Sequence, residues 1–181
     1  MTDLIEALRA DHAYMAHVLD VIDRQLGLIE GEQPVDLELL QDAVYFMTEY
    51  PDLFHHAREN LMYRRLSQRH RKHRAAVRDL ERAHATLAAL GLAFREVVED
   101  AAEDLPVARS VLLEHGKDYL AAQRDHIEAE ERRIFPWVLE CLDEADWRAI
   151  DDALPKTGPV GVREHTRERF RTLHDVLHGG G

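Results

Sequence analysis

The chain has 181 residues, of which 35 are Asp or Glu and 23 are Lys or Arg, so its formal net charge is −12. This length suits one domain with a substantial core, and the acidic balance argues against nucleic acid as a partner, because such a partner needs a clustered basic face. The single cysteine, Cys141, excludes an intramolecular disulfide and a cysteine-based metal cluster, and it favours a reducing compartment, so we expect a cytoplasmic protein.

Long stretches of helix-forming residues, separated by the few Gly and Pro residues, make up most of the chain. No segment alternates with a period of two, so we expect an all-α protein without strands. No apolar run approaches the roughly 18 residues of a membrane span, and the opening residues lack an export signal, so no membrane association is expected. The predicted helices cover, in chain order, residues 3–29, 36–66, 72–101, 107–141, 144–154 and 162–177.

Short connections between the four long helices favour antiparallel neighbours. We therefore predict an up-down-up-down four-helix bundle over residues 1–142, followed by a short helical C-terminal extension over residues 143–181. Pro51 removes a backbone donor within the second helix, and we expect a kink there. The basic stretch 69–74 is expected to be a solvated turn between the second and third helices.

Two histidines lie on apolar seams that face the predicted core. His12 belongs to a series on the first helix that steps by three and four residues, and His84 belongs to the same kind of series on the third helix. The two seams are Leu8, His12, Met15, Leu19, Ile22 and Leu26, and Val77, Leu80, His84, Leu87, Gly91, Phe94 and Val98.

The second and fourth helices each carry a histidine followed four residues later by a glutamate. His55 precedes Glu59, and His126 precedes Glu130. This spacing places the imidazole and the carboxylate on one face of a helix, one turn apart. The apolar residues that follow each pair keep to the same face, so both pairs are expected to point inward.

The four histidines also lie at one level of the predicted bundle. At 1.5 Å per residue, each lies roughly 27–30 Å from the end that carries the first and third connections. The separation of His12 from His55 is 43 residues and that of His84 from His126 is 42, which indicates two similar helical hairpins. Such hairpins, related by a pseudo-twofold axis, would build a site for two metal ions bridged by Glu59 and Glu130.

A simpler alternative is that each inward histidine is an ordinary core residue with a hydrogen-bond partner. Inward glutamates are harder to explain in this way, because a buried carboxylate is costly unless it is paired or coordinated. Imidazole and carboxylate donors without a thiolate suit iron, manganese or zinc. A ferritin-like site is disfavoured, because such bundles use Glu-x-x-His on two helices and Glu on the other two.

The sequence resembles the hemerythrin-like proteins with an HHE cation-binding domain. The residues that carry the resemblance are Asp11-His12, His55-His56-Ala57-Arg58-Glu59, His84, and His126-Ile127-Glu128-Ala129-Glu130-Glu131 followed by Ile134-Phe135-Pro136. The resemblance implies a non-haem centre of two iron ions, oxo- or hydroxo-bridged, that binds O₂ at an open position. It also implies terminal ligands at His12, His55, His84 and His126, and bridging carboxylates at Glu59 and Glu130.

The chain departs from the oxygen-carrying members of this group on the third helix. Leu80 and Ala88 stand where a second histidine one turn from His84 would lie. His56 is the best candidate for a fifth imidazole; the alternative is that it faces another helix or solvent. Tyr119 is expected to pack in the core, although it could face the metal cavity.

Fewer imidazoles would leave an open metal position, which favours reactivity with O₂, nitric oxide or peroxide. We therefore expect a di-iron protein that binds or senses O₂ or a related diatomic ligand, or that handles iron, and no catalytic residue is assigned. One alternative is a di-iron enzyme of peroxidase or nitric-oxide-handling type. Another is a metal-stabilised signalling or scaffold module with residues 144–177 as its interaction surface.

Overall fold

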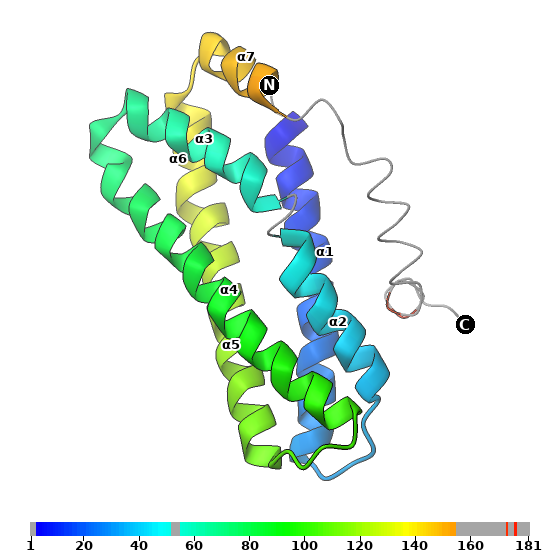
Figure 1. The fold of residues 1–181 in the computed structure, drawn as a ribbon. Helices are drawn as coiled ribbons and strands as arrows, with labels where there is room; N and C mark the ends of the chain where they lie inside the picture. The colour runs from blue at the N-terminus through cyan, green and yellow to red at the C-terminus, as the bar shows by residue number, and fades with distance from the viewer. Residues whose placement is uncertain (1–2, 52–54, 155–172, 174–175, 177–181) are drawn as a thin grey trace.

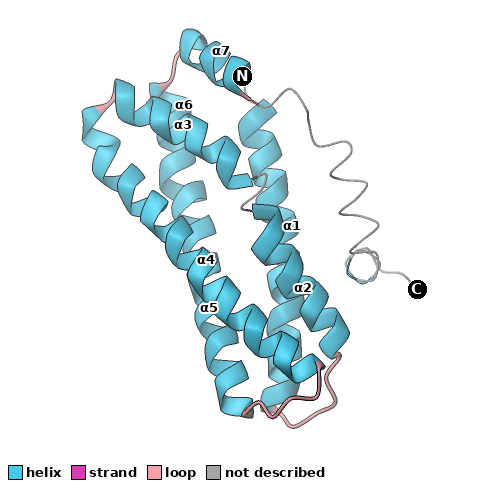
Figure 2. Ribbon diagram, viewed as in Figure 1, coloured by secondary structure: helices cyan, strands magenta, loops and turns pink. Residues whose placement is uncertain are grey.

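The computed structural model describes residues 3–51, 55–154, 173 and 176, and all regular structure among them is helical (Figures 1 and 2). None of the helices in this described part is long and apolar enough to cross a membrane. In chain order the elements are α1 (Asp3–Glu30), α2 (Leu37–Tyr50), α3 (His56–Arg69), the 3₁₀ turn η2 (Arg71–His73), α4 (Arg74–Ala102), α5 (Arg109–Ala129), the π-helical turn η3 (Glu130–Ile134), α6 (Phe135–Cys141) and α7 (Glu144–Ala153).

Four of these helices pack along one another as α1 against α2 and α5, and α4 against α2 and α5. The turn from α1 to α2 and the turn from α4 to α5 lie at the same end of the molecule (Figure 1). Each turn holds one residue with a positive φ, Glu32 at 55° and Asp104 at 57°, which ends the preceding helix. The predicted helix boundaries in this part agree with the observed ones to within two or three residues.

The second predicted helix is irregular where the sequence analysis expected a kink, because Pro51 and His55, on either side of residues 52–54 that lie outside the described part, are π-helical. α2 ends at Tyr50 with Pro51 as its C-terminal cap, and α3 begins at His56 after the N-cap His55. The fourth predicted helix also differs from a regular one, because the wide turn η3 separates α5 from α6. Both irregularities directly adjoin the predicted metal-site residues, and π-helical turns are frequent at functional sites.

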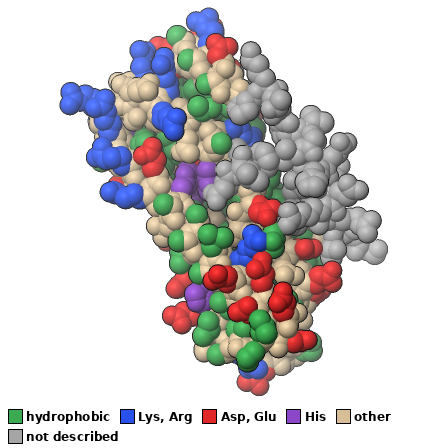
Figure 3. All heavy atoms as spheres, in the orientation of Figure 1, with side chains coloured by type: hydrophobic (Ala, Val, Ile, Leu, Met, Phe, Trp, Pro, Cys, Tyr) green, Lys and Arg blue, Asp and Glu red, His purple; other side chains and the backbone are tan. Residues whose placement is uncertain are grey.

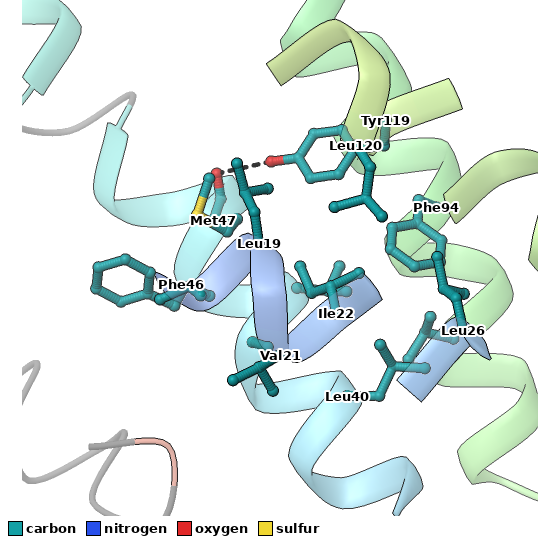
Figure 4. Packing of buried hydrophobic residues seen from close by; sticks show 14 of the residues in the cluster. Leu19, Val21, Ile22, Leu26, Leu40, Phe46, Met47, Phe94, Tyr119 and Leu120 are labelled. Atoms are coloured by element: carbon teal, nitrogen blue, oxygen red, sulfur yellow. Dashed lines mark hydrogen bonds between the residues drawn. The ribbon is translucent and has the colours of Figure 1, made fainter. Parts of the chain in front are cut away.

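The apolar core consists of two clusters, one on either side of the predicted site. The first involves α1, α2, α4 and α5 and includes Ile22, Leu26 and Phe94 (Figure 4). The second joins the start of α1 to α3, α6 and α7 and includes Leu8 and Trp147. All residues of the two predicted seams are buried, so the three-and-four spacing identified the inward faces correctly.

Part of the predicted C-terminal extension packs on the second cluster. Asp143 caps α7 through a capping box, and Trp147 and Ile150 are buried. The carboxylate of Asp146 is fully buried and accepts from Arg65 of α3 at 2.6 Å. The helix predicted near residues 162–177 lies outside the described residues except for Leu173, which is buried in the first cluster, and Val176.

Basic side chains gather over the end of the bundle where α3 passes to α4 (Figure 3). The stretch 69–74 is the predicted turn, although His73 is buried and its ring packs against Trp137 with centroids 4.3 Å apart.

Candidate metal centre

The structure brings the six residues of the predicted constellation to one level between the two apolar clusters. They come from different elements: His12 lies on α1, His84 on α4 and His126 on α5. The remaining three lie at or beside helix ends: His55 caps α3, Glu59 lies in its first turn and Glu130 begins η3. All six side chains are buried, and both carboxylates are 0% exposed.

Four of these residues form a first donor group, which consists of His12, His55, Glu59 and Glu130. The Nε2 atoms of His12 and His55 are 2.9 Å apart. Nε2 of His55 lies 3.0 Å from Oε1 of Glu59, and Nε2 of His12 lies 3.3 Å from Oε2 of Glu130. One nitrogen from each ring and one oxygen from each carboxylate therefore converge on a common point.

A second donor group consists of His56, Glu59, His84 and His126. The Nε2 atoms of His84 and His126 are 3.1 Å apart, and Nε2 of His84 lies 3.5 Å from Oε2 of Glu59. The ring of His56 stacks on that of His84, with centroids 3.9 Å apart and planes inclined by 20°. His56 is thus a member of the second group, as a fifth imidazole ligand would be.

The oxygens of the two carboxylates suit a cationic partner. Both oxygens of Glu59 and Oε2 of Glu130 are buried with no donor in hydrogen-bonding geometry, and imidazole nitrogens of His12, His55 and His84 lie 3.0–3.6 Å from them. Leaving a buried carboxylate unpaired is costly, so these atoms need a positive charge, which a bound metal ion or a protonated imidazole can supply. Because imidazole nitrogens surround the same oxygens, a divalent metal with mixed nitrogen and oxygen ligands suits the set.

Without a metal, the imidazoles neutralise the carboxylates. Burial alone would lower the pKa of His12, but Glu130 and Glu59 outweigh it and raise that pKa to about 10. Burial would raise the pKa of Glu130, but the imidazoles of His12, His84 and His126 beside it hold that pKa well below its usual range. Burial lowers the pKa of His126 to about 4, so this ring is neutral.

Two acidic residues outside the constellation orient its histidines. Nδ1 of His12 lies 2.8 Å from Oε1 of Glu131, whose other oxygen accepts from Arg9 at 3.0 Å. Nδ1 of His55 lies 3.3 Å from Asp11. A carboxylate on the second ring nitrogen is the usual support of a metal-binding histidine, because it fixes the tautomer and the ring orientation.

Sequence reasoning did not assign roles to Asp11 and Glu131, although Asp11 directly precedes His12 and Glu131 directly follows Glu130. It also missed Tyr63, whose hydroxyl donates to Oε1 of Glu130 at 2.5 Å. Tyr63 lies four residues after Glu59 and therefore on the same helix face, which indicates an inward side chain but not its contact with Glu130.

The half of the site that contains His56, His84 and His126 adjoins two hollows. A pocket of about 70 Å³ reaches His56 and is lined on its other sides by Met47, Leu87, Tyr119 and Gln123, among others. Tyr119 itself is buried in the first cluster, as expected, and donates to the carbonyl of Met47 (Figure 4). A larger groove of about 260 Å³ between α4 and α5 reaches His126, whose Nδ1 is buried without a hydrogen-bond partner.

An all-helical fold with two adjoining His/Glu donor groups defines a metal-binding helical domain. Comparison with known families identifies which one. The family model of the Hemerythrin HHE cation binding domain matches residues 3–138, and the chain therefore belongs to this family. Searches of curated proteins and of solved structures found no match.

Proposed function

We propose that this chain is a non-haem di-iron protein that binds or senses O₂ or a related diatomic ligand. The observation that carries the proposal is the pair of donor groups that share Glu59, with three buried carboxylate oxygens that lack a donor in hydrogen-bonding geometry. The supporting scaffold would be an up-down-up-down four-helix bundle over residues 1–142, in a cytoplasmic protein.

The donor set favours iron as the metal. Five imidazoles and two carboxylates, with no thiolate among the donors, are ligands of intermediate character that suit iron. In this proposal His12, His55 and Glu130 would hold one ion, and His56, His84 and His126 would hold the other. Glu59 belongs to both donor groups, and Oε1 of Glu130 lies 3.3 Å from Nε2 of His126, so both carboxylates would reach both ions. The two irons would supply electrons and an open coordination position for the diatomic ligand.

The remaining residues of the chain orient the imidazoles and keep bulk water out. Asp11 and Glu131 hold the rings of His55 and His12 through their Nδ1 atoms. Apolar side chains above and below the carboxylates are buried and separate the site from solvent; they are Leu8, Met15, Leu80, Leu87 and Ile134. Such shielding favours a small neutral ligand over hydrated ions.

The pocket beside His56 suits a ligand of diatomic size. Its volume of about 70 Å³ leaves room for a small molecule of at least the size of water. Its lining combines apolar side chains with the amide of Gln123, so a small ligand would meet few competing charges.

Metal analysis of the purified protein, followed by anaerobic reduction and exposure to air, tests the proposal. We expect two iron ions per chain and a visible charge-transfer band that appears on exposure to air. Iron content well below two ions per chain, or no spectral change on exposure to air, would contradict it. Rapid turnover of added peroxide would assign the centre to an enzyme instead.

A further inference from the structure

Two histidines of the site are supported in the same way, by a carboxylate that lies between an arginine and the Nδ1 atom of the imidazole. The carboxylate oxygens lie 2.8 and 3.3 Å from the two Nδ1 atoms, and each carboxylate accepts from its arginine at 3.0 Å. The carboxylate orients the ring, and the arginine holds the carboxylate in place. The two sets are Arg9, Glu131 and His12, and Arg58, Asp11 and His55.

His126 has an arginine near it but no carboxylate between them. Its Nε2 lies 3.1 Å from Nε2 of His84 and so faces the donor groups, whereas its Nδ1, on the other side of the ring, is buried without a hydrogen-bond partner. The residue as a whole is only 6% exposed. Arg133 lines the same groove between α4 and α5 as His126. Its guanidinium lies over the ring of Trp137, and within the described part of the chain no carboxylate pairs with it.

Small side chains keep this groove open. Its volume is about 260 Å³, whereas an apolar cavity of about 150 Å³ is enough to hold benzene. The groove therefore has room for a short organic molecule with an apolar chain. Its apolar lining consists of alanines spaced seven residues apart on each helix, together with two larger side chains: Ala76, Ala83, Ala122, Ala129, Leu80 and Ile134.

The charges along the groove restrict the occupant further. Asp79 and Asp125 also line the groove and oppose an anion, but Asp79 pairs with Arg82. Asp125 and Arg133 then remain as one negative and one positive group, so a single negative charge on the occupant is tolerated better than two. At the buried end the free Nδ1–H group of a metal-bound imidazole is a donor and requires an acceptor.

We propose that the groove between α4 and α5 binds a short-chain monocarboxylate, whose carboxylate accepts from Nδ1 of His126 and from Arg133. The bound acid completes a third set of arginine, carboxylate and imidazole, with the carboxylate supplied from outside the chain. This inference rests on the proposed function, because a metal ion on Nε2 of His126 fixes the ring proton on Nδ1.

The test titrates the full chain, loaded with Zn²⁺ and labelled with ¹⁵N-histidine, with sodium propionate at constant ionic strength. We expect saturable binding by calorimetry and a downfield shift of one imidazole N–H proton in the nuclear magnetic resonance spectrum. Propan-1-ol, which has the same chain and no charge, should produce neither effect. Arg133→Gln should raise the Kd for propionate by roughly tenfold or more, because a hydrogen bond between charged groups is lost. Ala122→Leu should abolish binding by filling the groove, and both variants should still bind two Zn²⁺ ions.

Arg132→Gln is the matched control. Arg132 pairs with Glu128 on the surface and does not line the groove, so its substitution should leave the Kd for propionate unchanged. Uptake of fewer than two Zn²⁺ ions by the unmodified protein would contradict the proposed function. Two bound ions without saturable propionate binding would overturn the groove site alone. Binding that neither Arg133→Gln nor Ala122→Leu weakens would place propionate on the cation itself and would overturn the groove site as well.

Discussion

Oδ2 of Asp11 lies 3.3 Å from Nδ1 of His55, although 44 residues separate the two in the chain. The same carboxylate accepts from the hydroxyl of Tyr50 at 2.9 Å and from Arg58 at 3.0 Å. Burial would raise the pKa of Asp11, but the hydrogen bond to His55 and the charge of Arg58 lower it below its ordinary value. A charged side chain of α1 therefore sets the orientation of an imidazole at the start of α3.

We expect Asp11→Asn to weaken cation binding at the His12 and His55 position by about 10- to 100-fold, as is usual when a supporting carboxylate is lost. Competition with a chelator of known affinity measures the change. Asp20→Asn is a suitable control, since Asp20 lies on the exposed side of α1 and pairs with Arg124. An affinity equal to that of the unmodified protein would show that Asp11 does not act through His55.

Glu59→Gln and Glu130→Gln should differ in the amount of metal that they retain. Because Glu59 belongs to both donor groups, its substitution should abolish tight binding of both ions. Glu130 belongs to the group of His12 and His55, although its Oε1 also lies 3.3 Å from Nε2 of His126, so its substitution should release mainly the ion at His12 and His55 and leave about one equivalent. Elemental analysis after dialysis against a weak chelator gives the count, with the exposed Glu128→Gln on α5 as control. Full metal retention by both variants would exclude these carboxylates as ligands.

Cation uptake should release protons at neutral pH. A metal binds neutral imidazole, whereas the raised pKa of about 10 leaves His12 protonated in the metal-free protein. Titration with Zn²⁺ in a weakly buffered solution that contains a pH indicator measures the release. We expect at least one proton per chain between pH 7 and 8, and a smaller release from His12→Gln. Uptake without any acidification would contradict the protonated state of His12.

The stability of the metal-free protein should decrease as the pH rises above neutrality. The folded pKa of His12, about 10, lies above its ordinary value of 6.5. Its contribution is therefore fully present below pH 6.5 and is lost as the pH approaches 10. Urea denaturation at several pH values between 6.5 and 10 should show this loss, and His12→Gln should flatten the profile. A profile of the unmodified protein that is flat over this range would be inconsistent with the pairing of His12 with Glu130 and Glu59.

Gly116→Ala should destabilise the bundle by about 1–3 kcal/mol, because the core is already filled at this position. A methyl group there would lie 2.6 Å from Cδ1 of Leu26 and 3.1 Å from Cε2 of Phe94. Thermal denaturation monitored by circular dichroism measures the effect. Gly27→Ala on α1 is the control, since nothing lies within 4 Å of its added methyl group, and it should be neutral or slightly stabilising.

The inward faces of α1 and α4 could be predicted because periodic apolar residues report directly on burial. Counting residues from the helix ends placed His12 and His84 at the same level as His55 and His126, because a helix rises by a constant 1.5 Å per residue. The contacts of Glu131 and Tyr63 could not be predicted in this way. They depend on how far neighbouring helices are rotated about their axes, and spacing within one helix does not contain that information.

The π-helical turn η3, which divides the fourth predicted helix into α5 and α6, was not predicted for a related reason. Pro136 was noted in the sequence, but a proline at the second position of α6 is tolerated and does not by itself require a wide turn before it. The turn η3 reflects the packing of Ile134 and Phe135 into the second apolar cluster. A preference that arises from tertiary contacts is not visible in local sequence.

The wide turn at Glu130–Ile134 makes the register of α6 sensitive to chain length. Phe135 follows its glutamate by five residues, whereas Tyr63 follows Glu59 by four, so the hairpins correspond only if one residue is counted as an insertion. Deleting a single residue from this turn would rotate everything after it by about 100° around the helix axis. Phe135 would then leave His12, on whose ring it stacks, and the indole of Trp137 would leave His73.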